Sequence, residues 1–388
     1  MHQSLRLSFV SIYCCLLLAS CDKAGISSGD GSGFSSATGG GSTGGGGGNT
    51  PQPGVLTSGE WNDFDNWNFW TGLMANDTFR LQQGRWGFYP NQKWLFTVKD
   101  ASGAAVPDAI ISISSGSNAL WQGRTNRFGK LNIVPGIFNS TSPANMQYNV
   151  KFNNQAYQTG TLNTALTDIN ITLPNPVNAA SNVDLMFVVD ATGSMGDEIN
   201  YLKTELLDVL NRADNQVQGT FRYASVFYRD FGDAYVTQGV DFTSNKTSIV
   251  DFVKAQSADG GGDYPEAVEE ALKKAMQQNW STSAKARILF LILDAPVHDD
   301  VQKQALLREQ VKLAASKGIM IIPVAASGVD KPSEFLFRFM ELSTNATYTF
   351  LTNDSGIGNN HITPTVGAYQ VEFLNNLMVR LIAKYGGN

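Results

Sequence analysis

Three oxygen-bearing side chains stand at alternate positions directly after a strongly apolar stretch of this sequence. The stretch VDLMFVV leads into Asp190, and Thr192 and Ser194 follow on a turn that Gly193 allows to close tightly. Carboxylate and hydroxyl oxygens are hard ligands, which suit Mg²⁺ and also Mn²⁺ or Ca²⁺. A helix cap would explain only one of the two hydroxyls. The pattern therefore predicts a divalent-cation site.

The elements that must position these side chains alternate between strands and helices over residues 183–385. We expect strands at 183–189, 221–228, 288–293, 319–325 and 347–351, with an edge hairpin at 234–242, and helices at 195–211, 265–278, 301–316, 333–342 and 369–384. This alternation is typical of an α/β fold with a doubly wound, mainly parallel sheet, here six-stranded. Ligands of such sheets bind at the carboxyl ends of the strands, where Asp190 stands.

The segment DATGSM resembles the metal-ion-dependent adhesion site of von Willebrand factor type A domains, whose pattern is aspartate, hydroxyl, serine. The resemblance covers residues 183–385 and implies a Rossmann-like fold. It implies that Asp294, which ends ILFLILDAP, is the second aspartate of the site, and that Asp263 stands where family members commonly have a threonine. The expected ligands of the cation are Asp190, Thr192, Ser194, Asp263 and Asp294.

Asp263 changes what the family resemblance implies about binding. A carboxylate in place of a hydroxyl adds a third negative charge around one cation, which would hold the cation more firmly and weaken its attraction for an acidic side chain of a partner. Asp263 could instead act through water, with Gly260 to Gly262 letting its loop move. We expect Arg229, Asp230 and His298 to line the rim of the site.

A smaller all-β sandwich is predicted at residues 94–175, from short β-prone runs at 94–99, 109–114, 131–134, 148–152 and 169–173. The strings VKDASGAAVPDAIISI and TNRFGKLNI resemble transthyretin-like or carboxypeptidase regulatory-like sandwiches, with Asn126 in place of the usual aspartate. Residues 55–93 are rich in aromatic side chains, which we expect to pack on the sandwich; a carbohydrate-stacking face is the alternative.

The amino terminus has the features of a bacterial lipoprotein. Residues 1–20 form a short apolar run with the properties of a signal peptide, and Leu18 to Cys21 resemble a lipobox, which implies acylation (for example by palmitate) of Cys21. Residues 21–54 are dominated by Gly and Ser and are expected to be a flexible tether. These features predict a lipid anchor in the cell envelope, on the outer membrane or cell surface rather than the inner membrane.

The leading functional hypothesis is a membrane-anchored adhesion module that binds a protein, whose acidic side chain could complete the cation's coordination. A metal-dependent assembly partner of a membrane complex is the alternative. A hydrolase is disfavoured because the chain has no HExxH or P-loop motif, and no GxSxG outside the Gly- and Ser-rich tether. The net charge of -6 also argues against a nucleic-acid partner.

Overall fold

The computed structural model of this chain describes residues 56–387, except residues 179 and 356–359. The predicted signal peptide, the lipid-bearing Cys21 and the tether at 21–54 all lie outside the described residues. Within this described part of the chain, no helix has both the length and the apolar character that a bilayer span requires.

The α/β region contains an eight-stranded sheet in the order β11-β10-β9-β12-β13-β14-β1-β15. The six predicted strands are all present: β9 (Val183–Asp190), β10 (Phe221–Tyr228), β11 (Thr237–Thr243), β12 (Ala286–Leu293), β13 (Ile319–Ala325) and β14 (Tyr348–Thr352). All of them run parallel except β11, which pairs antiparallel with β10. Every residue of β9 and β12 is buried, as expected of strands covered on both faces.

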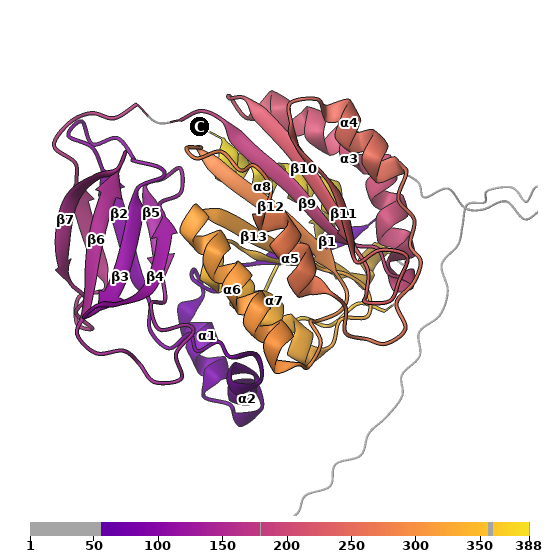
Figure 1. Cartoon of the computed structure of the whole chain (residues 1–388), viewed down its shortest axis with the longest axis horizontal. Coiled ribbons are helices and arrows are strands. Elements are labelled where there is room, and N and C mark those ends of the chain that lie inside the picture. Colours follow the sequence, from indigo (N-terminus) through magenta and orange to yellow (C-terminus); the bar gives the residue numbers. More distant parts are fainter. Residues whose placement is uncertain (1–55, 179, 356–359, 388) are drawn as a thin grey trace, which may run out of the picture. The chain divides into compact units, whose positions relative to one another are not determined.

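Helices cover both faces of this sheet (Figure 1). One set comprises α5 (Val268–Met276), α6 (Val301–Lys317) and α7 (Lys331–Thr344), and the other comprises α3 (Gly196–Gln216), α4 (Lys246–Lys254) and α8 (Leu374–Gly386). Successive side chains of a strand point to opposite faces, so Met186 and Val188 join the core of the first set, while Leu185 and Phe187 join the core of the second. The prediction of a doubly wound α/β fold is confirmed.

Two strands were not predicted, and they correct the expected place of the aromatic-rich segment. β1 (Thr57–Trp61) pairs antiparallel with β14, and β15 (Glu372–Phe373) pairs with β1. The helices α1 (Trp67–Met74) and α2 (Asp77–Trp86) follow, and the ring of Trp70 lies 5.7 Å from that of Phe339 in α7. The start of this segment therefore packs on the α/β region, because β14 offers an unpaired strand edge that β1 satisfies. Its end also packs on the sandwich, where the ring of Phe88 lies 5.4 Å from that of Phe138 and the Tyr89 N–H donates to the carbonyl of Ile137 at 2.6 Å.

The β region consists of a three-stranded sheet, β5-β2-β8, and a four-stranded sheet, β4-β3-β6-β7. Its strands are β2 (Trp94–Lys99), β3 (Ile110–Ser115), β4 (Asn118–Arg124), β5 (Lys130–Ile133), β6 (Met146–Phe152), β7 (Gln155–Thr161) and β8 (Asp168–Thr172). Phe96 of β2 and Tyr148 of β6 form an edge-to-face ring contact at 5.2 Å, so side chains of the two sheets share a core. The polar strands β4 and β7 were not predicted, and membership of a carboxypeptidase regulatory-like family stays a prediction.

Candidate metal centre at the carboxyl ends of the strands

Asp190 ends β9 and is completely buried. Its Oδ1 accepts hydrogen bonds from the backbone N–H of Thr192 at 2.9 Å and from the Thr192 hydroxyl at 2.8 Å. The hydroxyl oxygens of Thr192 and Ser194 lie 3.4 Å apart, and the short helix η1 (Gly193–Met195) then leads into α3. The turn after β9 thus brings together the carboxylate and both hydroxyls, as the sequence predicts.

Asp294 follows the neighbouring strand β12 and is 5% exposed. Burial raises the pKa of Asp294, and the nearby Ser194 hydroxyl at the turn after β9 opposes that rise. Burial, followed by repulsion from Asp294, raises the pKa of Asp190 to about 7. Two carboxylates are therefore held together in a site from which water is largely excluded.

Glu266 is a further carboxylate of this site, and sequence reasoning missed it. Its side chain is 4% exposed, and burial followed by the charges of Asp190, Asp230 and Asp294 raises its pKa to about 9. We expected a helix from residue 265, but α5 begins at Val268. Glu266 instead continues the preceding loop, and its backbone N–H donates to the carbonyl of Pro296 at 2.9 Å. The only signal in the sequence was a second acidic residue three positions after Asp263.

The glycine-rich loop is fixed against the turn after β9. The Gly193 N–H donates to the carbonyl of Gly260 at 3.1 Å, and the carboxylate of Asp233 accepts from the Gly261 N–H at 2.9 Å. Gly261 has a φ of +72°, and a Cβ there would lie 3.0 Å from Oε1 of Glu266 and 3.2 Å from Cβ of Thr192. Only glycine lets the loop pass this closely between the two side chains.

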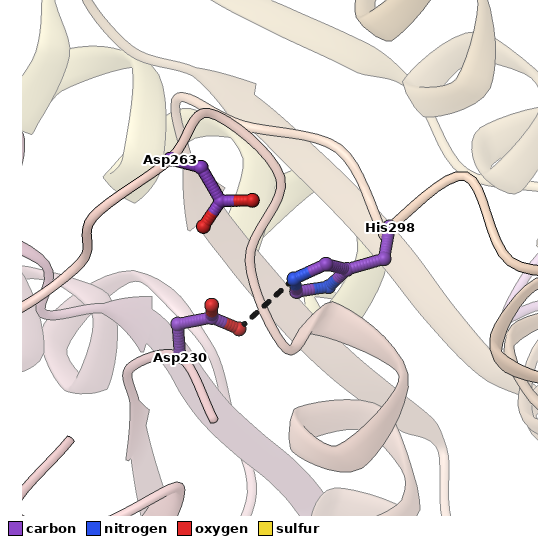
Figure 2. Close-up of side chains that lie close together, drawn as sticks. All are labelled: Asp230, Asp263 and His298. Atoms are coloured by element: carbon purple, nitrogen blue, oxygen red, sulfur yellow. Dashed lines mark ion pairs between the residues drawn. The ribbon is translucent and has the colours of Figure 1, made fainter. Parts of the chain in front are cut away.

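The three remaining predicted acidic and imidazole residues lie together in a second group, shown in Figure 2. The structure brings Asp263 to Asp230 and His298, with one ligand atom of each residue within 4.8 Å of the others. His298 Nε2 lies 3.3 Å from Oδ1 of Asp230. Arg229 turns to the adjacent loop, where it donates to the carbonyl of Ser257 at 2.9 Å. The structure groups Asp263 with the two rim residues, and its predicted ligation beside Asp190 stays a prediction.

Part of this chain is similar to known proteins. The family model for the von Willebrand factor A domain matches residues 184–358. The α/β region of this chain has a von Willebrand factor A-like fold. A protein described as von Willebrand factor type A from Catenulispora acidiphila covers 78% of this chain, with 51% of its own chain matched, at 12% identity and a TM-score of 0.39.

Two curated proteins also match part of the chain. An ariadne-like RING finger protein of Acanthamoeba polyphaga mimivirus is 32% identical over 118 residues, or 30% of this chain, and an alpha-protein kinase of Dictyostelium discoideum is 29% identical over 126 residues, or 31% of this chain. This chain spans 11% of the first relative and 20% of the second.

Von Willebrand factor A (VWA) domains commonly bind a divalent metal ion. The buried carboxylates of this chain fit such an ion. Asp190 Oδ2 and Glu266 Oε2 are buried and have no hydrogen-bond partner. Unpaired buried carboxylate oxygens are costly unless a cation approaches them. Asp190, Thr192, Ser194 and Asp294 would hold the ion, with Glu266 adjacent, and this all-oxygen donor set suits Mg²⁺, Mn²⁺ or Ca²⁺.

The buried carboxylates predict an unusual pH dependence of the metal-free chain. Folding raises the pKa of Asp190 from 3.8 to about 7 and that of Glu266 from 4.5 to about 9. Above pH 5 the folded chain keeps protons on these groups that the unfolded chain has released, so stability falls as the pH rises through about 7 and about 9. In EDTA, calorimetric melting should therefore show a lower Tm at about pH 9.5 than at about pH 6. Glu266→Gln should reduce this fall, and an equal Tm at both pH values would contradict the assignment.

Proposed function

We propose that this chain is a protein-binding module that depends on a divalent cation at the carboxyl ends of β9 and β12. The observation that carries the proposal is the convergence of Asp190, Ser194 and Asp294, with two buried carboxylate oxygens that lack a partner, in a VWA-like fold. When bound, the cation would supply an electrophilic point at a surface otherwise rich in carboxylates. The chain's own residues would hold the ion and present the surrounding loops.

Exposed aromatic side chains beside the site support a protein ligand. Phe231 follows Asp230 and is 45% exposed, and Tyr264 follows Asp263 and is 39% exposed. Aromatic side chains are enriched at protein interfaces because they bury a large area at a low cost in conformational entropy. We propose recognition without catalysis. The sequence expectation that an acidic side chain of the partner reaches the cation remains part of the proposal, although Glu266 adds negative charge there.

We further propose that the chain is attached to the bacterial envelope through an acylated Cys21, with its binding region facing outward. The support is the sequence Leu18 to Cys21 and the Gly- and Ser-rich stretch after it. Incorporation of labelled palmitate into the wild type but not into Cys21→Ser would bear this out, and equal labelling of both would contradict it.

Crosslinking on intact cells tests the binding proposal. With Mg²⁺ present, the chain should crosslink to one or a few defined proteins, and EDTA should remove these products, because the cation completes the binding surface. Restoring Mg²⁺ should restore them. Products that are the same with and without EDTA would contradict a cation-dependent ligand.

A further inference from the structure

A second group of metal-ligand side chains stands near the first and has a different donor chemistry. It consists of Asp230 after β10, Asp263 in the glycine-rich loop and His298 after β12. Figure 2 shows the three side chains pointing toward one another from three separate loops. We propose that this group is a second cation site, selective for a transition-metal ion such as Zn²⁺. The proposal goes beyond the proposed function and does not depend on it.

The burial of the Asp230 carboxylate indicates that it binds a cation as well as contacting His298. Asp230 is 8% exposed, and its Oδ1, which faces His298, has no hydrogen-bond partner. A buried carboxylate oxygen without a donor is costly, and a cation between Asp230 and His298 would remove that cost.

The imidazole of His298 and the carboxylate of Asp230 lie at the distance of an ion pair, and the same distance fits shared ligation of one cation. His298 Nε2 and Asp230 Oδ1 are 3.3 Å apart, longer than the roughly 2.7–2.9 Å of a charge-assisted hydrogen bond. Two ligands at about 2.0–2.1 Å from one tetrahedral ion lie about 3.3 Å apart. All ligand pairs of one tetrahedral ion lie about 3.3–3.6 Å apart, so the exposed carboxylate of Asp263 would move in by up to about 1.5 Å from the 4.8 Å limit of the group.

Backbone contacts hold the three loops in place, so the group is preorganised. The Asp233 carboxylate accepts from the N–H of Asp230 at 3.0 Å and from that of Gly261 at 2.9 Å, which joins the loop after β10 to the glycine-rich loop. Glu266 joins the glycine-rich loop to the loop after β12 through the carbonyl of Pro296. The imidazole nitrogen selects the metal, since imidazole suits Zn²⁺ whereas Mg²⁺ prefers oxygen alone.

Calorimetric titration with Zn²⁺ in excess Mg²⁺ tests this site, because Mg²⁺ fills the all-oxygen site first. The full-length chain should carry no polyhistidine tag and should have Cys14, Cys15 and Cys21 replaced by serine, since thiolates bind Zn²⁺. We expect one Zn²⁺ per chain and a loss of affinity of at least about tenfold in His298→Gln and in Asp263→Asn. His361→Gln is the matched control, because His361 already bonds Asn353 at 3.0 Å, and it should leave Zn²⁺ affinity unchanged.

Three outcomes would overturn the second site: no Zn²⁺ binding in excess Mg²⁺, equal Zn²⁺ affinity in His298→Gln and the wild type, or Zn²⁺ binding that Asp190→Asn abolishes. The visible spectrum of bound Co²⁺ gives a second readout, which His298→Gln should change while the far-ultraviolet circular dichroism stays that of the folded chain. Zn²⁺ binding without any Mg²⁺ binding would support the second site and contradict the proposed function, so the two are separable.

Discussion

Asp190→Asn should lower the affinity of the chain for Mg²⁺ by about 100-fold or more, since even residues that only orient metal ligands contribute about 10- to 100-fold. The substitution keeps the shape of the side chain but removes the charge of the buried carboxylate that ends β9. Calorimetric titration of the EDTA-treated chain measures the loss. The same variant should also lose the crosslinked products that depend on Mg²⁺.

Stability provides the control for this prediction. In the metal-free chain burial, followed by repulsion from Asp294, raises the pKa of Asp190 to about 7. Asp190→Asn removes this repulsion, so at pH 8 the metal-free variant should be at least as stable as the wild type. Asp197→Asn is the matched control: Asp197 is exposed in the first turn of α3, and its loss should leave Mg²⁺ affinity nearly unchanged. Wild-type affinity in Asp190→Asn would contradict the site.

Asp63→Asn should lower the free energy of unfolding by about 3–5 kcal/mol, which is the usual cost of breaking a buried ion pair by removing one partner. Asp63 and Arg338 are both fully buried, and Arg338 donates two hydrogen bonds to the Asp63 carboxylate, at 2.6 and 2.8 Å. The pair ties the segment after β1 to α7. Without Asp63 a buried guanidinium loses its closest carboxylate.

Urea denaturation followed by circular dichroism measures this change. The matched control is Asp65→Asn, which removes the same charge from an exposed position two residues later and should change stability by less than about 0.5 kcal/mol. Asp63→Asn combined with Arg338→Met should recover part of the loss, because no unpaired charge then remains buried. A loss below about 1 kcal/mol in Asp63→Asn would show that the segment before the β region is not anchored in this way.

The core of the metal centre could be predicted from the sequence because it depends on local order along the chain. Asp190 comes directly after the apolar run LMFVV and Asp294 directly after ILFLIL, and parallel strands bring their carboxyl ends to one edge of the sheet. Thr192 and Ser194 follow within one turn. Nothing beyond the strand pattern is needed to bring these four side chains together.

Glu266 and the partners of Asp263 could not be predicted, because their positions depend on contacts between loops. Pro265 and Glu266 are typical of a helix start, yet Glu266 forms a parallel bridge with Val297 and the helix begins two residues later. Asp263 meets Asp230 and His298 only because Asp233 and Glu266 hold the three loops together. No spacing in the sequence encodes those cross-loop hydrogen bonds.

β1 shows the same limit for the fold. Its five residues, TSGEW, have little β propensity of their own, and they form a strand because β14 offers a free edge almost 300 positions later in the chain. The aromatic residues that follow then pack on α7, which is equally distant in sequence. A pattern confined to residues 55–93 indicates burial but not the surface against which the residues are buried.

A crystal of the chain soaked in Mn²⁺ and measured near the manganese absorption edge tests the central claim most directly. We expect an anomalous peak bounded by the oxygens of Asp190, Ser194 and Asp294, with Thr192 and Glu266 adjacent. Well-ordered side chains at these positions with no peak between them, or a manganese peak only at another place on the chain, would contradict it.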